Sequence, residues 1–222
     1  MIRRSTYGLI TIAAFIAAAC TSDQVTGAKA GPGRGVLAVK LTDAPLPLDS
    51  VKEVNVFVER IDARRARTDS DSVSEHMDDD GHEAENEGGR RDSTLWVTIA
   101  TPNQAFNMLA LQNGVTAFLG ATPVDTGHFK SVRLIIDPAR SNIVLKDGTV
   151  LTTTSTPPVE FENSHRHGLL VELQDSLEVN EGSTTTITLD IKLNQSITLR
   201  GHTVRDGFLF RPVVDGRSHR ED

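Results

Sequence analysis

Apolar and polar residues alternate along most of this chain, and this period of two constrains the fold more than any other feature of the sequence. Successive side chains of a strand point to opposite faces of its sheet, so alternation predicts strands with one buried face. The clearest run is residues 187–193, where Ile, Leu, Ile and Leu alternate with Thr, Asp and Lys. Similar runs occur at residues 36–41, 54–58, 95–99, 132–136, 169–173 and 208–210.

Turn-forming residues separate these runs. Asp and Asn side chains bond to nearby backbone groups, and Gly adopts the positive φ angles of tight turns. No window of a dozen residues has a helical period, although residues 106–112 are expected to form one short helical turn. Many short strands joined by turns predict an all-β fold, an antiparallel, immunoglobulin-like β-sandwich over residues 35–215, with a polar tail at residues 216–222. The turn signals are Asp43-Ala44-Pro45, Asn113-Gly114, Asp147-Gly148, Asn180-Glu181-Gly182 and Asp206-Gly207.

The N-terminus has the pattern of an export signal. Arg3 and Arg4 precede an uncharged, apolar stretch at residues 8–19, which is shorter than the roughly 20 residues that a membrane-spanning helix needs. We therefore expect a signal peptide over residues 1–19 and export by the Sec route. Small residues precede Cys20, the only cysteine of the chain.

Cys20 resembles the lipid-bearing cysteine of bacterial lipoproteins, and this resemblance implies cleavage before Cys20 and a lipid anchor on its thiol and amine. Residues 20–34 are small, polar and Gly-rich, which predicts a flexible tether between membrane and domain. The residue after the cysteine is Thr21 and not Asp, which favours the outer membrane over the inner. Cleavage without lipidation is the alternative.

One acidic segment accounts for the net charge of −7. Residues 69–87 hold nine acidic residues and no Lys or Arg, so the rest of the chain sums to +2. Like charges without apolar periodicity predict a disordered loop over residues 68–92, inserted between two strands that pair without it. Hard oxygen ligands also suit Ca²⁺, and imidazoles suit Zn²⁺. The alternative for this loop is thus weak cation binding through Asp78, Asp79, Asp80, Glu83, His76 and His82.

Several motifs together resemble one known family. The stretches 35–45, 51–60 and 126–137, with Trp96-Val-Thr-Ile99 and Phe210-Arg-Pro-Val-Val214, are similar to a domain of unknown function from bacterial and archaeal envelope lipoproteins (DUF4382). The resemblance covers about residues 34–215, and departs at Phe129, where Tyr is more usual. It implies an envelope location and a transthyretin-like or carbohydrate-binding-like sandwich, but no reaction.

Three further residues are candidates for ligand binding. Trp96 is the one strong aromatic platform of the mature chain, as a sugar ligand would require. His165 and His167 flank an arginine in a loop at one end of the sandwich, where such folds bind ligands; an exposed connecting loop is the alternative. Asp43, before Ala-Pro, is interpreted as a turn former, with ion binding as the alternative.

The motifs of the common enzyme classes are missing. The sequence has no Gly-x-Ser-x-Gly elbow, His-Glu-x-x-His motif, P-loop or dinucleotide fingerprint. We therefore assign no catalytic residue and no cofactor, and expect a non-enzymatic binding or structural module. Its expected partners are the membrane, through the lipid, and an envelope protein or glycan. The charge excludes nucleic acid, and a hydrolase or metal-dependent enzyme remains the alternative class.

Overall fold

The computed structural model describes residues 28–46, 49–66, 95–162 and 168–221, and nearly all regular structure in them is β. None of the described helices has the length and apolar character needed to cross a membrane. The strands are β1 (Arg34–Asp43), β2 (Val51–Arg65), β3 (Trp96–Ala100), β4 (Gln104–Asn107), β5 (Ala117–Asp125), β6 (Gly127–Ile136), β7 (Asn142–Leu145), β8 (Val150–Leu151), β9 (Val159–Phe161), β10 (Leu169–Val179), β11 (Thr184–Ile191), β12 (Ile197–Leu199), β13 (Phe208–Phe210) and β14 (Val214–Glu221). The short helices are η2 (Met108–Leu111), η3 (Pro138–Arg140), α2 (Leu193–Ser196) and η4 (Val204–Asp206).

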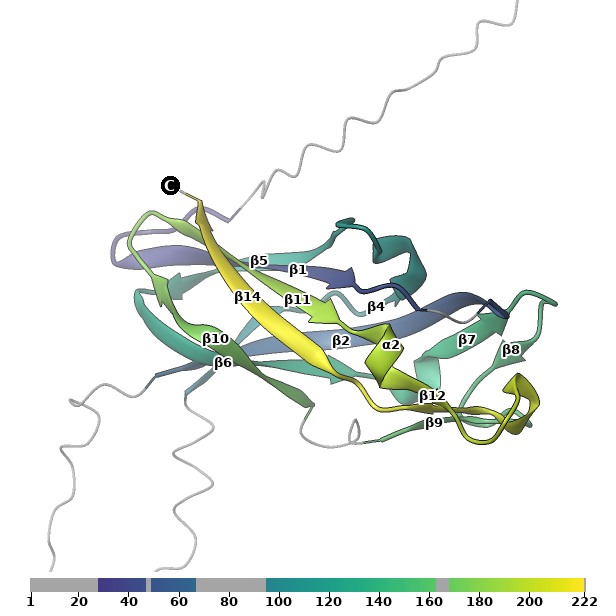
Figure 1. Cartoon of the computed structure of the whole chain (residues 1–222). Coiled ribbons are helices and arrows are strands. Elements are labelled where there is room, and N and C mark those ends of the chain that lie inside the picture. Colours follow the sequence, from purple (N-terminus) through teal and green to yellow (C-terminus); the bar gives the residue numbers. More distant parts are fainter. Residues whose placement is uncertain (1–27, 47–48, 67–94, 163–167, 222) are drawn as a thin grey trace, which may run out of the picture.

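Most of these strands belong to one long, curled sheet with the order β5-β1-β11-β14-β10-β6-β2-β7-β8, and β3 and β4 also pair with β2. Figure 1 shows the sheet folding over, so that the layer with β1, β11 and β14 lies across from the layer with β6, β2 and β7. A small sheet, β12-β13-β9, lies at one end. The predicted all-β sandwich is confirmed, although β1–β11, β10–β14 and β9–β13 pair in parallel.

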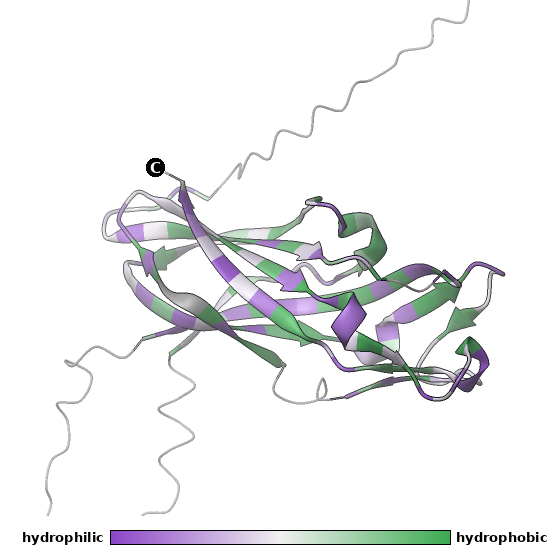
Figure 2. Cartoon of the chain, viewed as in Figure 1, coloured by the Kyte–Doolittle hydropathy of each residue, from purple (hydrophilic) through white to green (hydrophobic). Residues whose placement is uncertain are grey.

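The core lies between the two layers. Val39 and Leu41 of β1 are fully buried beside their β11 partners Ile187 and Leu189, as the alternating pattern requires. Burying each such side chain contributes roughly 1.5–3 kcal/mol. Figure 2 shows hydrophobic and hydrophilic residues succeeding one another in short blocks along the strands, which leaves polar residues on the outer faces.

A β-bulge in β2 decides which of its residues face outward. Val58 pairs with Ile136 and Arg60 with Ile135, so Glu59 is the extra residue. Before the bulge, the buried side chains include that of the even-numbered Val58. After the bulge, the odd-numbered Ile61 and Ala63 are buried instead. A bulge re-aims the side chains that follow it. The side chains at positions 60, 62 and 64 are therefore presented on the outer face of the sheet.

Two of the sequence-based boundaries are wrong. The expected polar tail at residues 216–222 is almost entirely strand, because β14 pairs along its whole length with β11 and touches β10 at Gly216. A Cβ on Gly216 would lie 2.8 Å from Leu173 Cδ2, so glycine permits this close approach. The run at residues 187–193 also ends early, since Leu193 begins α2. The predicted helical turn at residues 106–112 is confirmed as η2, capped by Asn107.

Candidate functional site

Three neighbouring strands, in the order β6, β2 and β3, bring one set of polar side chains together on the outer face. Asp62 pairs with Arg133 of β6 on one side and with Thr98 of β3 on the other, so the three share a row. In the next row, Arg64 pairs with Trp96. Directly opposed residues project from the same face of a sheet. The Trp96–arginine surface consists of Arg60, Asp62, Arg64, Trp96, Thr98 and Arg133.

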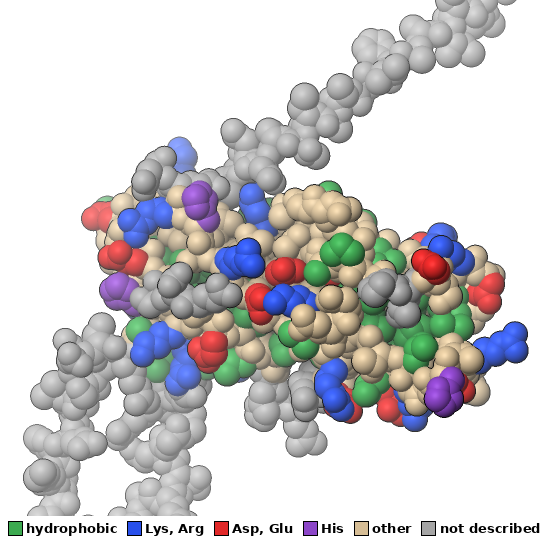
Figure 3. All heavy atoms as spheres, viewed as in Figure 1, with side chains coloured by type: hydrophobic (Ala, Val, Ile, Leu, Met, Phe, Trp, Pro, Cys, Tyr) green, Lys and Arg blue, Asp and Glu red, His purple; other side chains and the backbone are tan. Residues whose placement is uncertain are grey.

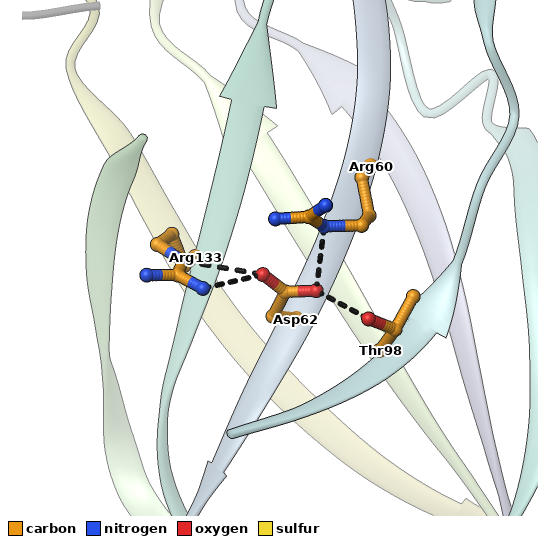
Figure 4. A network of polar contacts seen from close by, with 4 residues as sticks. All are labelled: Arg60, Asp62, Thr98 and Arg133. Carbon is orange, nitrogen blue, oxygen red and sulfur yellow. Dashed lines mark hydrogen bonds and ion pairs between the residues drawn. The ribbon is translucent and has the colours of Figure 1, made fainter. Parts of the chain in front are cut away.

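The Asp62 carboxylate is the centre of this surface, and Figure 4 shows two arginines and Thr98 converging on it from three strands. Its Oδ1 accepts hydrogen bonds from Arg60 Nε at 3.0 Å and from Thr98 Oγ1 at 2.8 Å. Its Oδ2 accepts from Nε and Nη2 of Arg133 at 3.2 and 2.7 Å. Asp62 is only 2% exposed, and four donors satisfy it.

The hydrogen bonds also set the charge of this carboxyl group. Burial alone raises the pKa of Asp62, because it penalises the charged form. The hydrogen bonds from Arg133 and Thr98, with the charges of Arg60 and Arg133, outweigh burial and lower the pKa below its usual 3.8. Asp62 is therefore ionised at neutral pH and holds both guanidinium groups in fixed positions.

Trp96 lies beside two of the arginines. The Arg133 guanidinium carbon is 4.6 Å from the centroid of the Trp96 ring, and that of Arg64 is 5.9 Å away. Such cation–π contacts contribute about 0.5–1 kcal/mol at exposed sites and hold the ring against the charges. Trp96 is partly exposed. The aromatic candidate thus lies on the protein surface, next to polar and charged groups.

The other candidates from the sequence lie outside the described residues: Cys20, His76, Asp78, Asp79, Asp80, His82, Glu83, His165 and His167. The strands that flank the acidic segment do pair with each other, as expected, from Ile61–Ala100 to Arg64–Trp96. Within the described ranges, no group of three or more His, Cys, Asp or Glu side chains is arranged to hold a metal ion.

Asp43 forms a second polar feature, for which the turn-former interpretation was incomplete. Besides its local bond to Ala44, it accepts from the Leu193 backbone N–H at 3.2 Å, and Gln112 lies 3.5 Å away. It therefore ties the end of β1 to the start of α2. Burial, and secondarily the charge of Asp190, raise the pKa of Asp43 to about 7 against the opposing hydrogen bonds.

Asp190 is half-buried, and within the described part of the chain its Oδ1 atom has no hydrogen-bond partner. Asp190 is opposite Asp215 of β14, which forms an ion pair with Lys192. No ligand chemistry follows from this arrangement alone.

The face around β14 carries charged side chains of both signs. Figure 3 shows basic and acidic side chains next to one another on this face. The ion pairs Lys192–Asp215 and Arg220–Glu178 are two examples. On the Trp96–arginine surface, Arg60 and Arg133 share one carboxylate, that of Asp62. There the basic side chains also lie beside an aromatic ring, that of Trp96.

Fold and surface together define an all-β sandwich module with a charged, aromatic patch on an open sheet face. The chain belongs to the family described as "Domain of unknown function (DUF4382)", whose model matches residues 34–212. The match extends from β1 to just past β13, so it includes every residue of the Trp96–arginine surface. No curated protein matches the chain.

Proposed function

We propose that this chain is a lipoprotein of the prokaryotic cell envelope, anchored through Cys20, whose β-sandwich is a non-enzymatic binding module. The Trp96–arginine surface is its contact surface. The observation that supports this is the position of Trp96, partly exposed on the outer face and flanked by Arg64 and Arg133. Trp and Arg are the residue types most enriched where binding energy is concentrated.

The chemistry of the surface supports binding over catalysis. A general acid or base works best with a pKa near the operating pH and with an atom that can reach the substrate. Asp62 meets neither condition, since its pKa is lowered and both carboxylate oxygens are occupied. Asp43 has a pKa of about 7, but it is 5% exposed and holds α2 in place.

The N-terminal sequence supports the envelope location. An uncharged stretch precedes the sole cysteine, and the Gly-rich tether that follows leads to β1 at Arg34. Several acyl chains on one cysteine give stable anchoring, because each buried CH₂ contributes roughly 0.8 kcal/mol. Cell fractionation of the wild type and Cys20→Ser tests this. We expect the wild type in the membrane fraction, the outer membrane in a two-membrane cell, and the variant in the soluble fraction. A variant that stays membrane-bound would exclude the anchor.

Binding is tested with the full chain, purified in non-ionic detergent and immobilised, by measuring the carbohydrate that it retains from envelope extracts. Trp96→Ala should lower the retained carbohydrate several-fold. Phe118→Ala is the matched control, because Phe118 is a 45% exposed aromatic on β5, away from the surface. Equal retention by the wild type and Trp96→Ala would contradict the proposed contact surface.

A further inference from the structure

The outer face of β2 carries a second polar cluster, further along the strand from the Trp96–arginine surface. Before the bulge, the alternate valines of this strand are buried, so Asn55 and Phe57 project from the outer face. Asn142 of β7 is opposite Asn55, and Arg140 of η3 lies over the Phe57 ring. We call Asn55, Asn103, Arg140 and Asn142 the amide cluster.

Hydrogen bonds hold the amide cluster in place. Asn55 Nδ2 donates to Asn142 Oδ1 at 3.0 Å, and Arg140 Nη1 donates to Asn103 Oδ1 at 3.1 Å. The Arg140 guanidinium carbon is 3.6 Å from the centroid of the Phe57 ring, so Phe57 is only 6% exposed although it lies on an outer face. Within the described residues, these bonds leave Oδ1 of Asn55 and the Nδ2 atoms of Asn103 and Asn142 for a ligand.

The Trp96–arginine surface offers groups of the same kind. Asp62 uses Nε of Arg60, and Nε and Nη2 of Arg133, which leaves three guanidinium nitrogens for other acceptors. The two arginine side chains are 39% and 24% exposed, so these nitrogens lie at the boundary with water. Thr98 is exposed and donates to Asp62, so its oxygen can accept from a ligand hydroxyl. Both clusters therefore present donors and acceptors in fixed positions.

The charges on this face compensate one another. In the Trp96–arginine surface two arginines share the Asp62 carboxylate, and the exposed Glu172 of β10 lies diagonally beside Arg133. In the amide cluster, Arg140 Nε is 4.0 Å from Asp137 Oδ2. Groups of opposite sign so close together produce little field at a distance, and salt screens what remains. The face therefore favours a neutral ligand that makes many hydrogen bonds.

A sugar chain has the chemistry and the length that this face requires. Its hydroxyls both donate and accept, and the C–H groups of a sugar ring can pack on the apolar area of Trp96. Asn55 and Asp62 are seven residues apart on β2, which corresponds to roughly 20 Å along the strand. A ligand that contacts both clusters must therefore be extended. Since the protein groups are already ordered, binding has a smaller entropic cost.

We infer that the outer face of β2 binds an extended, neutral polysaccharide. This inference rests on the proposed function and names its ligand class. The amides of Asn55 and Asn142 bind sugar hydroxyls at one end of the ligand. The free guanidinium nitrogens of Arg60 bind hydroxyls at the other end, where Trp96 packs against a sugar ring.

The charge of the retained carbohydrate tests the inference first. The carbohydrate that the full chain retains from envelope extracts is separated by anion-exchange chromatography into a neutral and an acidic fraction. Each fraction is then titrated calorimetrically into the full chain in non-ionic detergent. We expect saturable binding of the neutral fraction and no binding of the acidic one. Raising the salt from about 0.05 to about 0.5 M should change the affinity less than about twofold, because no ion pair forms with the ligand.

The contribution of the amide cluster is tested with Asn142→Ala. This variant should bind the neutral fraction about three- to tenfold more weakly, as expected for the loss of one hydrogen bond. The matched control is Asn194→Ala, since Asn194 is an exposed asparagine of α2 outside both clusters, and its affinity should change less than about twofold. Should Asn142→Ala fail to fold, as judged by circular dichroism, Asn103→Ala tests the same cluster at an exposed position.

Three outcomes would overturn the inference: binding of the acidic fraction in place of the neutral one, unchanged affinity in a folded amide-cluster variant, or an equal loss in Asn194→Ala. Each of these leaves the proposed binding function intact if Trp96→Ala still lowers retention of envelope carbohydrate. Loss of the Trp96 effect, in turn, would remove the proposed contact surface itself. The two failures are therefore distinguishable.

Discussion

Asp43→Asn is the substitution whose effect on stability depends most directly on burial. The Asp43 side chain lies at the end of β1, is 5% exposed and accepts from the Leu193 N–H. An asparagine has the same shape, stays neutral at every pH and keeps an amide oxygen for Leu193. The variant therefore changes the charge of the site and little else.

The expected magnitude follows from the pKa of Asp43. It is 3.8 in an unperturbed carboxyl and about 7 in the folded protein, because burial disfavours the charged form. Between these values the folded state binds more protons than the unfolded state, so the free energy of unfolding decreases as pH rises. The stabilisation is complete below pH 4 and is lost as pH rises through 7. The full separation corresponds to about 4 kcal/mol as an upper limit.

Urea unfolding of wild type and Asp43→Asn, at about pH 5 and about pH 8.5, measures this effect. Between the two pH values, the free energy of unfolding of the variant should rise relative to that of the wild type by about 2–3 kcal/mol. Asp190→Asn is the control. Removing the charge of Asp190 should lower the pKa of Asp43, so this variant should lose the stabilisation at a lower pH than the wild type does. Parallel pH profiles for wild type and Asp43→Asn would refute the reasoning.

Two other substitutions and one truncation test the fold and the network. Phe129 is fully buried, so Phe129→Ala should lower the free energy of unfolding by about 3–5 kcal/mol, and a loss below 1 kcal/mol would contradict its place in the core. Truncation after Val213 removes β14 from between β11 and β10 and should abolish cooperative thermal unfolding; an intact transition would mean that the strand is dispensable. Asp62→Ala leaves Arg133 without its partner and should cost about 3 kcal/mol at pH 7. Because the pKa of Asp62 is lowered, that difference should decrease as pH falls below 3.8, and a difference independent of pH would contradict the ionised carboxylate.

The sequence predicts the strands well where side-chain burial determines them. The alternating run at residues 36–41 is β1, and the run at 132–136 lies within β6. The predicted turn at Asn113-Gly114 is confirmed, since both residues have positive φ angles. β14 was missed for a physical reason. Among the residues of β14, Val214 is the only large hydrophobic one. Pairing with β11 on one side and β10 on the other, and not a hydrophobic face, therefore holds β14 in the sheet.

Of the six residues of the candidate site, the sequence predicted Trp96 alone. Trp96 is recognisable because it is the one tryptophan of the chain, and the structure places it, partly exposed, on an outer face. Its partners are not recognisable, because Asp62, Thr98 and Arg133 are far apart in the chain. The bulge at Glu59 turns Asp62 outward, and strand register then brings the three together. Neither the bulge nor the strand register can be recognised from a local pattern of residues.

The most direct test of binding through the Trp96–arginine surface uses the fact that the chain has a single tryptophan. Trp96 fluorescence of the full chain can be followed during titration with carbohydrate isolated from envelope extracts. We predict a saturable change in emission, with the same midpoint as calorimetric binding, which shifts to higher ligand concentration in Arg133→Gln. Calorimetric binding with no change in Trp96 emission would place the ligand elsewhere and contradict the account.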